Sequence, residues 1–321
     1  MEKMKAVILD GHTQNPGDLK WDYIEKTFDT TIYPRTPKEL IVERAKDADV
    51  IILNKIPITR EILTELPKLK FIATLATGYN QLDCEALKER GIPVSNIPSY
   101  STNGVAQMVF SYILEFTNRV SLYTDAVKHL EWSECEDFCF WNTPLHELDE
   151  KTLGIIGFGK IGRKVSEIAK AFGMNVCAYT PSGKKDSAEY VEFTTLDNVL
   201  KKSDFITLHC PLTEKTNKLV DKEFLDKIKD GACLINTARG GIVDEQAVSD
   251  ALKSGKLYCY GTDVLSTEPP AKNNPLLSAP NAFITPHIAW AAYETRTRLL
   301  EILNGNIKAF IDGSPINVVN M

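Results

Sequence analysis

The sequence predicts an α/β protein with two doubly wound parallel sheets, one in each of two domains. Three observations support this fold class. Apolar runs that suit buried strands alternate with helical patterns through residues 1–99, and the same alternation returns from residue 153 onward. Between these blocks a long helical pattern starts near residue 101, and a chain of 321 residues is of a length that suits two domains.

Four strands and three helices are expected in the first block. Thr36, Thr59 and Asp83 are predicted helix N-caps, because their side-chain oxygens can accept hydrogen bonds from first-turn N–H groups. Gly91 is expected to close the third helix. The strands are predicted at Ala6–Leu9, Val50–Leu53, Phe71–Thr74 and Ile92–Ser95. Short connections between these elements indicate a small parallel sheet covered on both faces.

A long helix, capped by Thr102 or Asn103, leads from the first block to the second. Six parallel strands are then expected, at Leu153–Ile156, Asn175–Tyr179, Phe205–Leu208, Cys233–Asn236, Tyr258–Thr262 and Ala282–Thr285. A last helix, which follows His287 and runs to Gly313, is expected to return to the first domain. The predicted domains are therefore residues 1–100 with 288–321, and residues 101–287.

The turn after the strand Leu153–Ile156 carries three glycines in the spacing G-x-G-x-x-G. Gly157 allows a tight turn, Gly159 lets the backbone approach a pyrophosphate, and Gly162 lets the next helix pack closely on the strand. The helix N-terminus offers N–H groups and a partial positive charge to the phosphates. Because a strand precedes the glycines and a helix follows them, this stretch predicts a Rossmann domain that binds NAD or NADP.

Three side chains suited to redox chemistry follow three later strands of the same sheet. Arg239, Glu268 and His287 all lie beyond carboxyl ends of predicted strands, where open α/β sheets bind their ligands. Reduction of a ketone by hydride transfer needs a proton donor, and histidine titrates near neutrality. A carboxylate can orient the imidazole, and the arginine fork suits a substrate carboxylate. Each residue alone has an ordinary alternative as a surface or loop residue, but together they predict hydride transfer.

Five stretches of the sequence carry a resemblance to a known family: LGIIGFGKIG, LHCPLT (208–213), INTARGG (235–241), GTDV followed by Glu268-Pro269, and Pro286-His287. Together they make the chain similar to the D-isomer-specific 2-hydroxyacid dehydrogenases over essentially its whole length. The family implies a Rossmann domain inserted into a flavodoxin-like substrate domain, and hydride transfer between NAD(P)H and a small 2-oxo acid. The run PHIAWA resembles most the glycerate dehydrogenase (hydroxypyruvate reductase) branch. Hydroxypyruvate and D-glycerate are thus the expected pair, with glyoxylate or another 2-oxo acid as the alternative.

The resemblance also implies roles for single residues of this chain. Arg239 would bind the substrate, Glu268 would partner the histidine, and His287 would be the general acid/base. The substrate carboxylate would also meet the backbone N–H groups of three consecutive residues, Ala76, Thr77 and Gly78. Asp263 would hold the nicotinamide carboxamide. The other implied cofactor contacts are Thr102, Gly157, Phe158, Gly159, Lys160, Ile161, Thr180, Cys210, Pro211, Thr237, Ala238 and His287.

One position departs from the pattern of NAD-preferring members, which carry an acidic residue at the end of the second Rossmann strand. Thr180 stands there, and Ser182 and Lys184 follow. Without a carboxylate nothing repels the 2′-phosphate of NADP, and these two residues could bind it. Alternatively the loop is solvated and NAD is used. The sequence leaves both cofactors open.

Composition argues against several other classes of protein and site. A net charge of −6 without a basic run argues against nucleic acid, and no apolar run approaches the ~20 residues of a membrane span. Seven scattered cysteines predict reduced thiols in the cytoplasm rather than a disulfide framework. Cys135 and Cys139 lie close in sequence but lack a companion pair, so no metal site is expected.

The segment after the long helix carries more apolar residues than one helix face needs. These are Val120, Leu122, Tyr123, Val127 and Leu130, and they predict a homodimer. Trp141, further along, could reach the active site or could be a core aromatic. A cofactor-sensing scaffold of the corepressor type, a different class of protein with the same fold, is the alternative to an enzyme.

Overall fold

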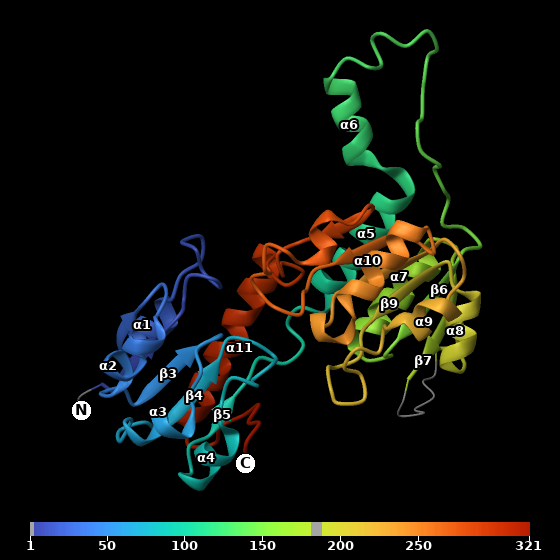
Figure 1. Ribbon diagram of the computed structural model, residues 1–321. Coiled ribbons are helices and arrows are strands. Elements are labelled where there is room, and N and C mark those ends of the chain that lie inside the picture. Colours follow the sequence, from blue (N-terminus) through green and yellow to red (C-terminus); the bar gives the residue numbers. More distant parts are fainter. Residues whose placement is uncertain (1–2, 181–187) are drawn as a thin grey trace. The chain divides into compact units, whose positions relative to one another are not determined.

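The computed structural model describes residues 3–180 and 188–321. Its contacts divide the chain into two compact units. Unit 1 comprises Met1–Tyr100 and Ala291–Met321, and unit 2 comprises Ser101–Trp290. The second boundary thus falls three residues after the sequence-based one at residue 287. The ribbon in Figure 1 follows the chain through both units.

Unit 1 is built on a five-stranded parallel sheet in the order β2-β1-β3-β4-β5. This is the flavodoxin-like strand order. Its strands are β1 (Lys5–Ile8), β2 (Asp29–Ile32), β3 (Val50–Leu53), β4 (Phe71–Thr74) and β5 (Val94–Ser95). Its helices are α1 (Asp22–Thr27), α2 (Ile41–Ala45), α3 (Arg60–Thr64), α4 (Cys84–Glu89) and α11 (Tyr293–Ile311).

Helix caps in unit 1 test the local predictions. Thr59 accepts a hydrogen bond from the N–H of Ile62 and Asp83 accepts one from Ala86, which confirms two of the three caps. Thr36 is not a cap, because its hydroxyl donates to the carbonyl of Leu9 at 2.5 Å. A short 3-10 turn, Lys38–Leu40, precedes α2 instead. The structure also contains α1 and β2, which the sequence analysis did not predict.

Helix α11 packs on the sheet of unit 1. Successive strand residues point to opposite faces, so Phe71 and Ile72 of β4 serve different cores. Ile72 joins the core beneath α2, α3 and α4, whereas the ring of Phe71 stacks on Phe310 of α11 with centroids 4.4 Å apart. Near the C-terminus, Asn320 accepts a hydrogen bond from the N–H of Val94. The C-terminal segment Ala291–Met321 therefore covers the second face of the sheet at β4 and binds its edge at β5.

Unit 2 is built on a seven-stranded parallel sheet in the order β12-β11-β10-β9-β6-β7-β8. Its strands are β6 (Thr152–Ile156), β7 (Asn175–Tyr179), β8 (Val191–Phe193), β9 (Phe205–Leu208), β10 (Ala232–Asn236), β11 (Leu257–Thr262) and β12 (Ala282–Ile284). Six were predicted, and β8 is an additional edge strand. The order reverses at β6, as in the doubly wound Rossmann fold, which confirms the predicted fold class.

Helices cover both faces of this sheet. They are α5 (Thr102–Asn118), α6 (Val120–Lys128), α7 (Lys160–Ala171), α8 (Leu196–Lys202), α9 (Lys222–Lys227) and α10 (Glu245–Ser254). Helices α5 and α7 share one core with Ile155, while α8, α9 and α10 share the other with Ile156. Ser101, not Thr102 or Asn103, is the N-cap of α5, and its side chain makes no capping hydrogen bond.

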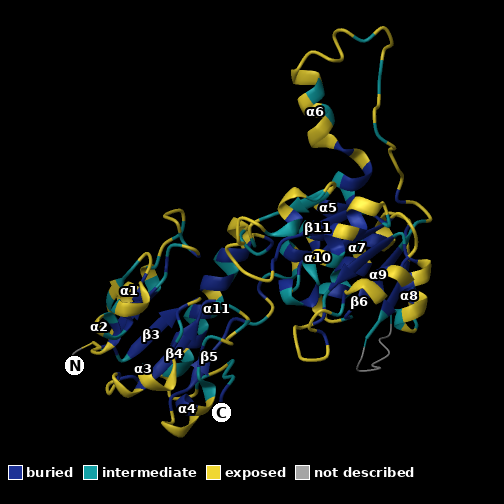
Figure 2. Cartoon of the chain, in the orientation of Figure 1, coloured by how far each residue is buried: buried dark blue, intermediate teal, exposed yellow. Residues whose placement is uncertain are grey.

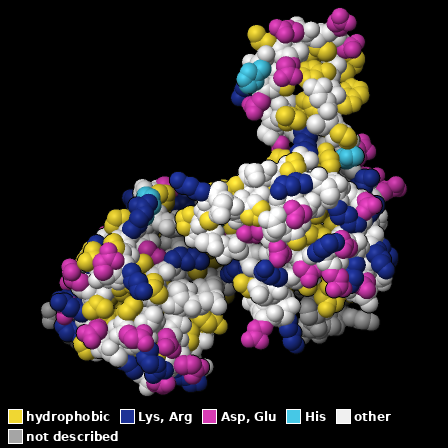
Figure 3. All heavy atoms as spheres, in the orientation of Figure 1, with side chains coloured by type: hydrophobic (Ala, Val, Ile, Leu, Met, Phe, Trp, Pro, Cys, Tyr) yellow, Lys and Arg dark blue, Asp and Glu magenta, His cyan; other side chains and the backbone are white. Residues whose placement is uncertain are grey.

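A segment of unit 2 projects beyond α5. Arg119, in the left-handed conformation at φ 51°, separates α5 from α6. Residues 120–147, called the arm below, are largely exposed (Figure 2). Hydrophobic side chains gather on this arm (Figure 3). Its exposed large hydrophobic residues are Val120, Leu122, Val127, Leu130, Trp132, Phe138, Trp141 and Leu145. Because Trp141 is 65% exposed, the alternative that it is a core aromatic is wrong.

Candidate active site

The glycine-rich turn lies where the strand order of unit 2 reverses. Gly157 has φ +97°, and a Cβ there would meet the backbone N of Cys210 at 2.6 Å. A Cβ on Gly162 would meet the carbonyl oxygen of Gly157 at 2.4 Å, so α7 packs against the turn only because this position lacks a side chain. Gly159 has nothing within 4 Å of its Cβ position. The turn therefore has the close packing and the open space that a pyrophosphate requires.

Other residues implied as cofactor contacts follow the neighbouring strands. Thr180 comes directly after β7, and Cys210 and Pro211 come after β9. Thr237 and Ala238 follow β10, and the hydroxyl of Thr237 is buried with no hydrogen-bond partner among the described residues. An orphaned buried hydroxyl at a strand end fits a site that a polar ligand completes. Ser182 and Lys184 lie outside the described residues.

His209, the residue directly after β9, is not suited to act as a general acid. Its Nε2 lies 3.0 Å from Oγ1 of Thr207, and burial lowers the pKa of His209 to about 3. The imidazole is therefore neutral near pH 7.

Arg239 is presented by a turn that Asn236 organises. The fully buried Asn236 side chain accepts a hydrogen bond from the N–H of Ala238 and donates one to the carbonyl of Arg239. The guanidinium stays exposed and donates to the carbonyl of Ala238 at 2.7 Å. At Gly240 a Cβ would lie 1.9 Å from the carbonyl carbon of Leu265, so this turn touches the loop after β11. Asn236 was missed by the sequence analysis because its partners are backbone groups of a turn.

His287 and Glu268 meet after β12 and β11. Nδ1 of His287 donates to Oε2 of Glu268 at 2.7 Å, and the two side chains are 30% and 36% exposed. The other Glu268 oxygen accepts the N–H of Leu265 at 3.2 Å. This arrangement fixes the ring and leaves Nε2 of His287 for another partner.

The carboxylate of Asp263 binds the loop that follows β12. Its carboxylate, 1% exposed, accepts N–H groups from Ile288 and Ala289, each at 2.8 Å, and the hydroxyl of Thr285 at 2.6 Å. The implied contact with a nicotinamide carboxamide thus adds to a carboxylate that already has three partners.

The implied carboxylate-binding residues belong to unit 1. Ala76, Thr77 and Gly78 follow the carboxyl end of β4. Two hydrogen bonds to Ile97 hold this loop in place. The carbonyl of Ala76 accepts the N–H of Ile97, and the hydroxyl of Thr77 donates to the Ile97 carbonyl. Across the described ranges, the N–H groups of these three residues donate no hydrogen bond within the protein. Such N–H groups suit an anionic ligand.

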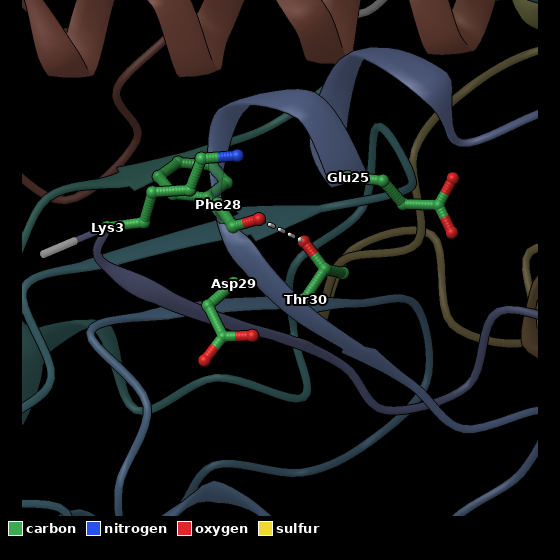
Figure 4. A pocket seen from close by; sticks show the side chains of 5 residues that line it. All are labelled: Lys3, Glu25, Phe28, Asp29 and Thr30. Atoms are coloured by element: carbon green, nitrogen blue, oxygen red, sulfur yellow. Dashed lines mark hydrogen bonds between the residues drawn. The ribbon is translucent and has the colours of Figure 1, made fainter.

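A separate pocket of about 560 Å³ in unit 1 does not fit a ligand site of this fold (Figure 4). Its lining residues are Lys3, Glu25, Phe28, Asp29 and Thr30. Lys3 precedes β1 and Asp29 begins β2, so the pocket lies at the amino ends of the strands. Open α/β sheets bind ligands beyond the carboxyl ends, at the opposite edge.

Comparison with known proteins identifies the family. Residues 110–289 match the NAD binding domain of the D-isomer specific 2-hydroxyacid dehydrogenases. A hydroxypyruvate reductase of Blautia hydrogenotrophica is 45% identical, over 99% of this chain and 100% of that protein. The chain belongs to the D-isomer specific 2-hydroxyacid dehydrogenase family. This result favours the enzyme over the scaffold alternative.

Solved structures extend the match to the whole fold. The D-lactate dehydrogenase of Aquifex aeolicus, complexed with NAD and lactic acid, superposes with a TM-score of 0.85 at 32% identity, over 99% of both chains. The acyclic imino acid reductase Bsp5, complexed with NADPH and D-arginine, superposes with a TM-score of 0.86 at 30% identity, over 98% of this chain and 100% of that chain. The enzyme is therefore a nicotinamide-dependent oxidoreductase of known architecture.

The described residues offer neither a metal site nor a membrane-spanning helix. Within residues 3–180 and 188–321, no group of three or more histidine, cysteine or acidic side chains is placed to hold a metal ion. No helix in the same part of the chain has the length and apolar character needed to cross a bilayer.

Proposed function

We propose that this dehydrogenase reduces hydroxypyruvate to D-glycerate and catalyses the reverse oxidation. The observation that carries the proposal is the His287–Glu268 pair, whose 2.7 Å hydrogen bond leaves Nε2 of the imidazole for a substrate oxygen. The 45% identity to a hydroxypyruvate reductase favours this substrate. Glyoxylate, a smaller 2-oxo acid, is the alternative.

Each implied residue has a distinct task in this proposal. Protonated His287 gives its Nε2 proton to the carbonyl oxygen during reduction, and Glu268 stabilises the imidazolium. Arg239 binds the substrate carboxylate through its planar fork and counters charge on the reacting oxygen. The N–H groups of Ala76–Gly78, which donate no hydrogen bond among the described residues, are the donors that unit 1 offers to a substrate carboxylate. The nicotinamide, when bound, supplies the hydride.

The cofactor is held by the turn Gly157–Ile161 together with Thr102, Cys210–Pro211 and Thr237–Ala238. The packing at Gly157 and the unpartnered hydroxyl of Thr237 support this assignment. Thr180 supplies no negative charge at the end of β7, so NADPH is accepted as well as NADH.

Steady-state kinetics test this proposal. Hydroxypyruvate should give a higher kcat/KM than glyoxylate or pyruvate, and NADPH should support a useful rate. A higher kcat/KM with glyoxylate would transfer the proposal to the alternative substrate. Rejection of NADPH by about a thousandfold, equivalent to about 4 kcal/mol, would contradict the interpretation of Thr180.

The enzyme acts in the cytoplasm as a homodimer whose interface includes the arm. Eight large hydrophobic side chains of the arm are exposed in a single chain, in a density that monomers rarely show. A two-fold dimer buries the same surface on both copies, and such dimers are the commonest assembly.

The mass in solution tests the dimer. Light scattering at micromolar concentration should give about twice the 35.9 kDa of one chain. Phe138→Glu should favour the monomer, because Phe138 is 89% exposed on the arm and a charge opposes its burial. Leu277→Glu, at an exposed site outside the arm, is the matched control and should leave the mass unchanged. A monomeric wild type would contradict the dimer.

A further inference from the structure

The backbone at His287 needs support from its surroundings. This residue has φ +56°, a left-handed conformation that only a few per cent of residues other than glycine adopt, although histidine is among the types enriched there. Its N–H donates to the carbonyl of Thr285, only two residues back, at 3.0 Å. Such a conformation persists when neighbouring contacts enforce it. The contacts that enforce it therefore decide where the imidazole lies.

The carboxylate of Asp263 binds the two residues that follow His287. Oδ1 accepts the N–H of Ile288, and Oδ2 accepts the N–H of Ala289. These two bonds fix the residues directly after the histidine. Because the carboxylate is almost fully buried, each bond is stronger than it would be in water.

Thr285, two residues before His287, is hydrogen-bonded to the same carboxylate. Its hydroxyl donates to Oδ1 of Asp263 at 2.6 Å. Because this proton is committed to Asp263, the hydroxyl of Tyr112 is the donor toward Thr285, and its one proton lies within reach of Oγ1 of Thr285 at 2.5 Å and of the carbonyl of Thr262 at 2.8 Å. The residues on both sides of His287 are therefore joined through one set of hydrogen bonds around the buried carboxylate of Asp263.

Tyr112 anchors this set to the long helix α5. The side chain is 4% exposed, and burial raises the pKa of its hydroxyl, which stays protonated at physiological pH. Its ring also packs on Gly261 of β11, where a Cβ would lie 2.7 Å from the ring. Three elements, α5, β11 and the end of β12, thus meet at these hydroxyls. The ring can reach them only because Gly261, within β11, has no side chain.

We propose that Tyr112 and Thr285 are positioning residues for the reaction, which hold His287 in its productive orientation through Asp263. The inference rests on the proposed role of His287 as general acid/base. Neither hydroxyl is assigned a contact with substrate or cofactor. Their effect is on the backbone that aims the imidazole at the carbonyl oxygen, where a displacement of about 1 Å can lower the rate a hundredfold.

Thr285→Val tests the proposal, because valine keeps the shape and removes the hydroxyl. We expect kcat to fall by roughly 10- to 100-fold, with the KM for the 2-oxo acid and the Kd for NADH changed much less. Tyr112→Phe should act in the same direction with a smaller effect. Thr285→Ser, which restores the hydroxyl, should recover most of the activity.

Thr117→Val is the matched control. Thr117 is a buried threonine on α5 whose hydroxyl donates only to carbonyls of its own helix, so this variant should keep the wild-type kcat. If Thr285→Val keeps the wild-type kcat, or if Thr285→Ser is as slow as Thr285→Val, the proposal is wrong. A parallel loss of NADH binding would also overturn it, since the hydroxyl would then act on the cofactor.

A double-mutant cycle separates this proposal from the proposed function itself. If Thr285 acts through His287, Thr285→Val should lower kcat little further in a protein that already carries His287→Gln. Additive losses would overturn the positioning role while leaving His287 in the mechanism. A wild-type kcat in His287→Gln alone would instead overturn the role of the histidine.

Discussion

Replacing His287 with glutamine should lower kcat by roughly 10²- to 10⁴-fold, the contribution that a positioned general acid makes. Glutamine preserves a polar side chain of similar length but has no proton to give at neutral pH. The hydrogen bond to Glu268, 2.7 Å in the structure, orients this imidazole and leaves its Nε2 for the substrate oxygen. The measurement is kcat for 2-oxo acid reduction, together with the Kd for NADH.

His146→Gln provides the control for this substitution. His146 is an exposed histidine of the arm, so the same chemical change there should leave kcat unchanged. The Kd for NADH should be close to that of the wild type in both variants, because the pyrophosphate site lies at the glycine-rich turn. A kcat near that of the wild type in His287→Gln would remove the residue from the mechanism.

Alanine at Gly157 and at Gly159 should have different consequences, although only one residue separates the two positions. At Gly157 the new Cβ meets the backbone N of Cys210 at 2.6 Å, in a conformation with φ +97° that strains any L side chain. We expect a loss of about 3 kcal/mol or more in the free energy of unfolding. At Gly159 nothing lies within 4 Å, so stability should change by less than about 1 kcal/mol.

The Kd for NADH should show why position 159 requires glycine although a side chain there would not disturb the fold. Its added Cβ would occupy space through which the backbone approaches the pyrophosphate, so the Kd for NADH should rise about tenfold or more. Urea denaturation of the apoprotein gives the stability, and fluorescence titration gives the Kd. Equal stability losses in the two variants, or unaltered NADH binding by Gly159→Ala, would contradict this account of the turn.

Much of the fold could be predicted because its central strands are buried on both faces. Runs such as Val50–Leu53 and Phe205–Leu208 are fully buried and continuous, which makes them readable from sequence. The missed strands lie at sheet edges. Asp29–Ile32 shows no fully buried residue and Val191–Phe193 has only three residues, so neither gives a strong apolar signal.

Two predictions of helix N-caps were wrong for different reasons. Residue type alone favours Thr36 as a cap, but its hydroxyl is taken by the carbonyl of Leu9 and by Arg44, both outside the local turn. At the start of α5 three consecutive residues, Ser101–Asn103, are polar, and composition cannot select among them. Local patterns therefore predict that a helix starts more securely than they predict which residue begins it.

The residues of the candidate site were predictable to the extent that topology determines them. Parallel strands bring their carboxyl ends to one edge, so Arg239, Glu268 and His287 could be selected from strand order alone. The residues that hold them could not. Asn236 acts on a turn, and Tyr112 reaches Thr285 across 173 positions of sequence, a contact that exists only after α5 has packed on the sheet.

The configuration of the reduced product tests the central claim most directly. Hydroxypyruvate is incubated with the enzyme and a reduced nicotinamide cofactor, and the glycerate formed is resolved by chiral chromatography. A D-isomer specific enzyme whose acid is His287 should give D-glycerate, and His287→Gln should make the same isomer far more slowly. L-glycerate, or a racemic product, would contradict the account.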